Sequence, residues 1–195
     1  MLILFVTKKK RKWRYDLPRE LTAELHKKAQ LRQTCTFTIN LLELLGMVVT
    51  AWVMLELVHD RPENPGDPIL MRGDNMAAVT WVNRCGGAKD KRAGLLMRTL
   101  GRLEESGGWY HEAKHIKGTQ NVLADGISRW PRADLEKRVR EHTNDGTWSE
   151  QAIGPRGESI FDTILKTKNF TVRHDKTLWS RMMGSANDTT REHIK

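Results

Sequence analysis

Three acidic residues stand where their carboxylates could work together. Glu43 lies early in an apolar segment, Asp74 follows a short apolar strand, and Asp125 lies in a helical stretch. Catalytic groups of α/β proteins gather at the carboxyl ends of strands, so we expect the three to converge there. Clustered carboxylates repel one another unless a divalent cation neutralises them, and Mg²⁺ prefers such oxygens. Two Mg²⁺ ions about 4 Å apart would suit phosphodiester hydrolysis.

A second motif, His111-Glu-Ala-Lys-His115, has the spacing of a zinc protease site. On a helix the two histidines would share a face and Glu112 would act as the general base. Residues 109–116, however, alternate like a strand between glycines. Four residues of a strand span about 13 Å, whereas a zinc–nitrogen bond is about 2 Å long. The pattern therefore argues against zinc.

The elements around these residues predict an α/β protein. Residues 1–16 read as two short strands joined by the basic run 8–12. The long helix 40–57, with Asn40 as its cap, is mostly apolar and therefore expected to be buried. The remaining expected elements are a strand at 69–71, helices at 76–83 and 93–105, a strand at 109–116 and a helix at 121–129.

Composition favours a folded protein with an anionic partner. The chain has 195 residues, 33 Lys and Arg against 24 Asp and Glu, and a net charge of +9. Nucleic acid is the expected partner of such a basic chain. No apolar run approaches the roughly 20 residues of a membrane span, and no signal peptide is recognised, so we expect an intracellular protein, nuclear or cytoplasmic, not secreted and without a membrane partner.

The two cysteines lie far apart and in no CxxC motif, which argues against a disulfide scaffold and a structural zinc site. Cys85 as a lone nucleophile is a weaker alternative, because buried or incidental thiols are commoner.

Three segments carry a resemblance. Leu42-Glu-Leu-Leu45, Met71-Arg-Gly-Asp-Asn75 and His115-Ile-Lys-Gly-Thr-Gln-Asn-Val-Leu-Ala-Asp-Gly-Ile-Ser-Arg129 follow one another in that order. Residues 1–130 thereby resemble the ribonuclease H domain of retrotransposon reverse-transcriptase polyproteins. The resemblance implies a mixed five-stranded sheet flanked by helices and Mg²⁺-dependent cleavage of the RNA strand in RNA–DNA hybrids. It matches Glu43, Asp74 and Asp125 to three of the four metal-binding acids, and implies a reverse-transcriptase region in a longer polyprotein as a partner.

The chain departs from that family at its beginning. The family starts with a strand that carries an Asp ahead of the hairpin, and nothing here matches this strand. Asp16 is no substitute, because it lies on a later strand and precedes Leu17-Pro18. We therefore expect an incomplete two-metal site that only a longer polypeptide could complete, and weak or absent cleavage by this chain alone. Residues 131–195 are expected to be a polar, partly helical tail or the start of a following region.

Substrate contacts are expected from a basic helix and one amide. Five cations on and before this helix are candidates for phosphate contact: Lys89, Lys91, Arg92, Arg98 and Arg102. A solvated helix face explains them equally well. Asn75 is a candidate for a contact from the minor-groove side of the hybrid. The competing interpretations are an active nuclease, an inactive nucleic-acid-binding remnant and a decayed fragment. His115 receives no proton-transfer role, since Thr119 stands where related ribonucleases carry a mobile histidine.

Overall fold

The computed structural model describes most of the chain between the first strand and residue 161. The described residues are 2–6, 11–15, 38–58, 66, 68–86, 90–143, 148–155, 157–158, 160–161 and 179. Lys89 and the connection 19–37 lie outside them.

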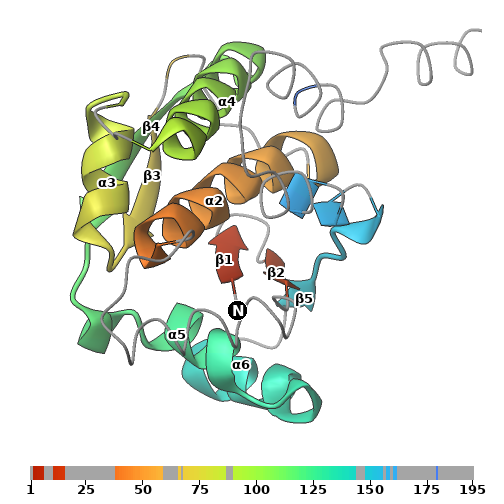
Figure 1. Cartoon of the computed structure of the whole chain (residues 1–195). Helices are drawn as coiled ribbons and strands as arrows, with labels where there is room; N and C mark the ends of the chain where they lie inside the picture. The colour runs from red at the N-terminus through yellow and green to blue at the C-terminus, as the bar shows by residue number, and fades with distance from the viewer. Residues whose placement is uncertain are drawn as a thin grey trace, which may run out of the picture.

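The described residues form a mixed α/β protein, as the sequence predicted (Figure 1). The strands are β1 (Leu2–Val6), β2 (Arg11–Tyr15), β3 (Pro68–Gly73), β4 (Tyr110–His115) and β5 (Ser149–Glu150). The helices are α2 (Ile39–Trp52), α3 (Met76–Asn83), α4 (Lys91–Gly107), α5 (Val122–Arg129) and α6 (Leu135–Thr143). Short helical turns are η1 (Val53–Val58), η2 (Gly118–Gln120) and η3 (Arg132–Asp134).

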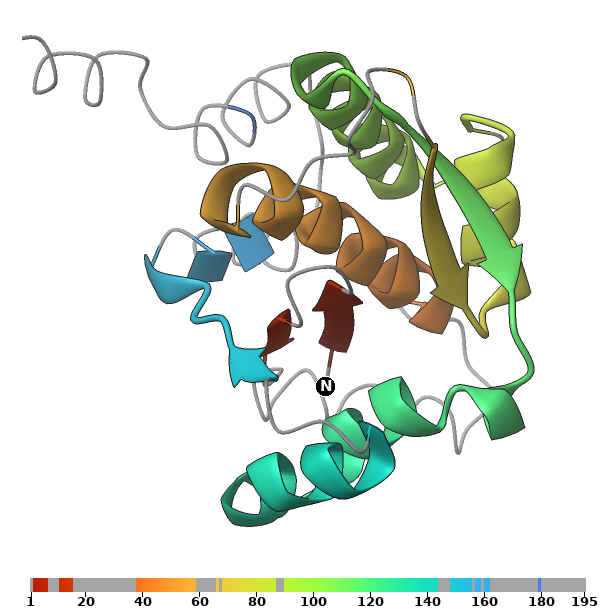
Figure 2. The same cartoon turned by 180° about the vertical axis from the view of Figure 1, so that it is seen from behind.

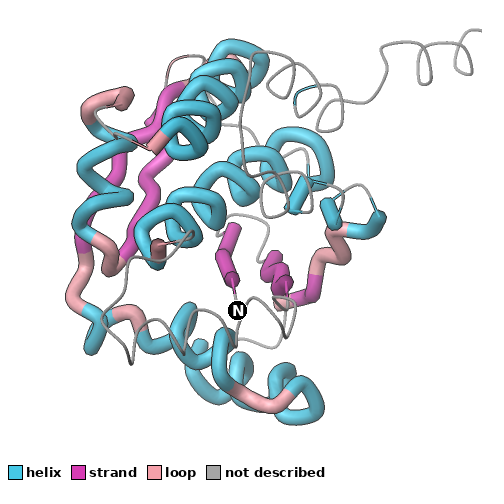
Figure 3. The backbone as a smooth tube through the Cα atoms, viewed as in Figure 1, coloured by secondary structure: helices cyan, strands magenta, loops and turns pink. Residues whose placement is uncertain are grey.

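The strands fall into two groups (Figure 3). In the first, β1 pairs antiparallel with β2, which confirms the predicted hairpin, and β5 pairs parallel with β2. In the second, β3 and β4 are parallel, and Gly73 lies opposite His115. Within the described strands the two groups do not pair with each other. Figure 2 shows β1 pointing opposite to β3 and β4.

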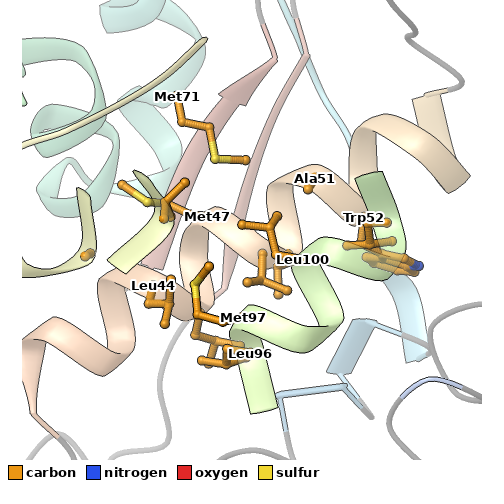
Figure 4. Packing of buried hydrophobic residues seen from close by; sticks show 14 of the residues in the cluster. Leu44, Met47, Ala51, Trp52, Met71, Leu96, Met97 and Leu100 are labelled. Atoms are coloured by element: carbon orange, nitrogen blue, oxygen red, sulfur yellow. The ribbon is translucent and has the colours of Figure 1, made fainter. Parts of the chain in front are cut away.

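Helix α2 forms the centre of the core and packs against β1, α3 and α4. All the leucines of α2 are buried, and Leu44, Leu45 and Trp52 are completely enclosed. Figure 4 shows this packing, in which Met47 of α2 and Met71 of β3 meet residues of α4 such as Leu100. The helix begins one residue earlier than expected, because Thr38 rather than Asn40 is its cap: Thr38 Oγ1 accepts from the Leu41 N–H at 3.3 Å.

The segment Ile39–Glu56 is long and apolar enough to cross a membrane by length and composition alone. In this fold 72% of the segment is buried inside the protein. Such burial is what a core helix requires, because its apolar side chains then contact protein on all sides.

Part of the segment after residue 130, expected as a polar, partly helical tail or the start of a following region, packs on the described core. Helix α6 packs against α5, and β5 extends the hairpin sheet. Ile160 and Phe161 are buried in the main core cluster. Part of this segment therefore stabilises the same core as α2.

Candidate carboxylate site

The structure brings Glu43 and Asp74 together. Glu43 lies in the second turn of α2 and is partly buried, while Asp74 is exposed and directly follows the last residue of β3. Burial raises the pKa of Glu43 to about 6, and the negative charge of Asp74 adds to this rise. The rise therefore comes mainly from loss of solvation, and a smaller part comes from the charge of the second carboxylate. Asp74 lies at the carboxyl end of β3, and the predicted site of three acids at this edge stays a prediction.

An amide pair flanks these carboxylates. Asn75 Nδ2 donates to Asn40 Oδ1 at 2.8 Å, which joins the first turn of α2 to the turn between β3 and α3. Asn75 also caps α3, since its Oδ1 accepts from the Ala78 N–H at 3.0 Å. Both ends of the Asn75 amide are therefore bound within the protein. The minor-groove contact expected for Asn75 stays a prediction.

The parallel pairing of β3 and β4 places His115 beside the site. Its Nε2 lies 3.2 Å from the backbone oxygen of Asp74. On the following turn η2, a Cβ at Gly118 would lie 3.7 Å from Asp74 Oδ2, so η2 also passes close to this carboxylate. Sequence reasoning left His115 without a role. The pairing register of β3 and β4 places His115 beside Asp74, and no local pattern in the sequence predicts that register.

The histidine motif lies on strand β4, which confirms the strand prediction for this stretch. His111 is buried, whereas His115 is exposed at the end of the strand. The His111 N–H donates to Glu104 Oε1 at 2.7 Å, and His111 Nδ1 lies 2.9 Å from the same oxygen. His111 thus anchors β4 to α4, and a helical zinc site does not form.

Asp125 lies apart from the other two acids. It is on α5, and its Oδ1 lies 2.8 Å from Arg129 Nη2, one helical turn away. Among the residues that the structure describes, no three His, Cys, Asp or Glu side chains are close enough to hold one metal ion. Glu43, Asp74 and Asp125 therefore do not form a three-ligand group in this conformation.

The basic residues of α4 have different environments. Asp90, the N-cap of α4, binds Arg92 through two contacts, 3.1 Å from Oδ1 to Nε and 2.7 Å from Oδ2 to Nη2. The hydrogen bonds from Arg92 lower the pKa of Asp90. The side chain of Arg92 is only 12% exposed and is part of the helix start, while its expected phosphate contact stays a prediction. Lys91 and Arg98 are exposed, and the guanidinium of Arg102 lies 5.5 Å from the ring centroid of Trp179.

Comparisons of the chain with the profiles of known protein families, with curated proteins and with solved structures found no match. The fold therefore defines a class only: a mixed α/β protein with two carboxylates at the carboxyl end of a parallel strand pair.

Proposed function

We propose that this chain is a ribonuclease H-like domain that descends from an RNA–DNA hybrid endonuclease of a retroelement. The observation that carries the proposal is the meeting of Glu43 and Asp74 at the carboxyl end of β3. The order of the three sequence segments supports it, because two of the segments supply these acids and the third supplies Asp125.

The carboxylate oxygens of Glu43 and Asp74 are the type of ligand that Mg²⁺ prefers. Mg²⁺ is held by one or two carboxylates plus water and phosphate oxygens, and two carboxylates meet here. Burial and, to a lesser extent, the charge of Asp74 disfavour the ionised form of Glu43, and a divalent cation held by both carboxylates would offset this. When bound, the cation would activate water and stabilise the leaving oxygen. Glu43 and Asp74 would hold it, and Asp125 would join them only after leaving Arg129.

The directions of the two described strand groups are compatible with one mixed sheet. The antiparallel hairpin and the parallel pair both belong to one mixed sheet in the family that the sequence resembles. A strand running in the direction of β3 would pair antiparallel with β1 and parallel with β3 (Figure 2). It would join the two groups into one sheet. We infer that the chain alone, in which Asp125 is paired with Arg129, cleaves weakly or not at all.

The alternative is an inactive nucleic-acid-binding remnant. It is favoured by one observation, the Asp125–Arg129 ion pair, which occupies the third carboxylate. The exposed Lys91 and Arg98 would then contact phosphates without cleavage. The net charge of +9 suits either function.

Cleavage of a hybrid with labelled RNA separates these functions. We expect weak Mg²⁺-dependent cleavage at most, which Asp74→Asn reduces to the uncatalysed background because it removes one metal-binding carboxylate. Glu112→Gln is the matched control, since Glu112 is an exposed acid on β4 that pairs with Lys114. It should leave any cleavage unchanged.

Each outcome decides between the candidates. Cleavage that Asp74→Asn leaves intact contradicts the carboxylate site. Binding that weakens as salt rises, without cleavage by the wild-type chain, supports the binding remnant. A chain that neither binds nor cleaves hybrids contradicts both functions.

A further inference from the structure

The Asn40–Asn75 hydrogen bond connects two segments that are 35 residues apart in the chain. The orientation of the Asn75 amide is fixed by hydrogen bonds of both its oxygen and its nitrogen. Asn75 Oδ1 is occupied by the Ala78 N–H, so its Nδ2 is directed toward α2, where Asn40 Oδ1 accepts. Both asparagines are partly buried, which shields this bond from competing water.

This bridge lies directly beside the two carboxylates. Asn40 precedes Glu43 by three residues, so the two lie on neighbouring positions of one helix face. Asn75 directly follows Asp74. The hydrogen bond therefore fixes the distance between the two backbone segments that carry the acids.

A second contact holds α2 against β3 on the other side of Glu43. Met47, one turn further along α2, packs so closely on Gly73 that a Cβ there would lie 2.6 Å from Met47 Cε. Glu43 thus lies between two anchors, one polar and one apolar. These two contacts limit how far α2 can move relative to the end of β3 and the turn that follows it.

We propose that Asn40 and Asn75 are a positioning pair that holds Glu43 and Asp74 within reach of one divalent cation before the cation binds. The role of the cation rests on the proposed function. The pair itself touches neither cation nor substrate in this account. It acts on the carboxylates through the backbone of α2 and of the β3–α3 turn.

Two measurements test this pair. Electron paramagnetic resonance gives the affinity for Mn²⁺, and thermal unfolding gives the stability of each variant. Asn75→Ser keeps a good helix cap but is too short to reach Asn40. Asn40→Ala removes the acceptor and favours the helix. Each variant should weaken Mn²⁺ binding by about tenfold, as loss of an outer contact at a metal site does, with little change in the unfolding midpoint.

Asn83→Ser is the matched control. Asn83 is also an amide bridge of α3, but it bonds the backbone N–H and oxygen of Ala113 on β4, both at 2.8 Å. Its loss should lower the unfolding midpoint and leave Mn²⁺ affinity unchanged. Wild-type Mn²⁺ affinity in both Asn75→Ser and Asn40→Ala would overturn the positioning role alone. A wild-type chain that binds no Mn²⁺ would overturn the cation site and the positioning role together.

Discussion

Replacing Glu43 by glutamine is expected to stabilise the protein above pH 6. The folded protein holds the pKa of Glu43 at about 6, above its ordinary value of 4.5, chiefly through burial and then through the charge of Asp74. The protonated form is therefore favoured by folding. Its stabilising contribution is complete below pH 4.5 and is lost as the pH rises through about 6. Each pKa unit corresponds to about 1.4 kcal/mol, so ionised Glu43 costs up to about 2 kcal/mol at pH 7.5.

Urea unfolding at two pH values measures this cost. Glu43→Gln should raise the free energy of unfolding by up to about 2 kcal/mol at pH 7.5 and leave it nearly unchanged at pH 4. Glu112→Gln, an exposed carboxylate-to-amide change, should shift it by less than about 0.5 kcal/mol at both. A Glu43→Gln variant that is less stable than the wild type at pH 7.5 would contradict the prediction that ionised Glu43 destabilises the folded protein. A stabilising substitution at a candidate catalytic residue is what a trade-off between stability and activity predicts.

Truncating Leu44 to alanine is expected to have the largest effect on stability. Leu44 is completely buried in the middle of α2, so the change removes apolar contacts and leaves a cavity. Such substitutions cost about 2–5 kcal/mol. Ile39→Ala, on the same helix but at a side chain that is 61% exposed, should cost less than about 0.5 kcal/mol.

The free energies of unfolding of Leu44→Ala and Ile39→Ala, each compared with the wild type, check this prediction. A large difference between Leu44→Ala and Ile39→Ala follows if α2 is a core helix. Equal effects of the two substitutions would mean that α2 is not packed as described.

Local patterns predicted most elements of the described chain. The alternation in residues 109–116 has the period of a strand, and β4 shows that period in its burial, with His111 and Ala113 inside and their neighbours outside. The apolar segment 40–57 likewise became α2 and η1 with nearly the expected ends. Such patterns are visible in one sequence because they depend on neighbours within a few residues.

The partner that each polar side chain binds could not be predicted from the sequence. Asn40 has the residue type of a helix cap, but its side chain bonds Asn75, and Thr38 caps the helix instead. Arg92 looks like a phosphate contact, but Asp90 two residues earlier binds it. His115 reaches Asp74 only through the register of β3 and β4. In each case the deciding partner is chosen by tertiary packing or by competition between nearby polar groups.

Glu43 and Asp74 are proposed to form one coupled carboxylate site. The most direct test is the pH titration of the Glu43 side-chain carbon by ¹³C NMR, in the wild type and in Asp74→Asn. The wild type should titrate at about 6. In Asp74→Asn the midpoint should fall but stay above 4.5, because burial, the larger cause, remains. A wild-type midpoint at 4.5, or one that Asp74→Asn leaves unchanged, would show that the two carboxylates do not share a site.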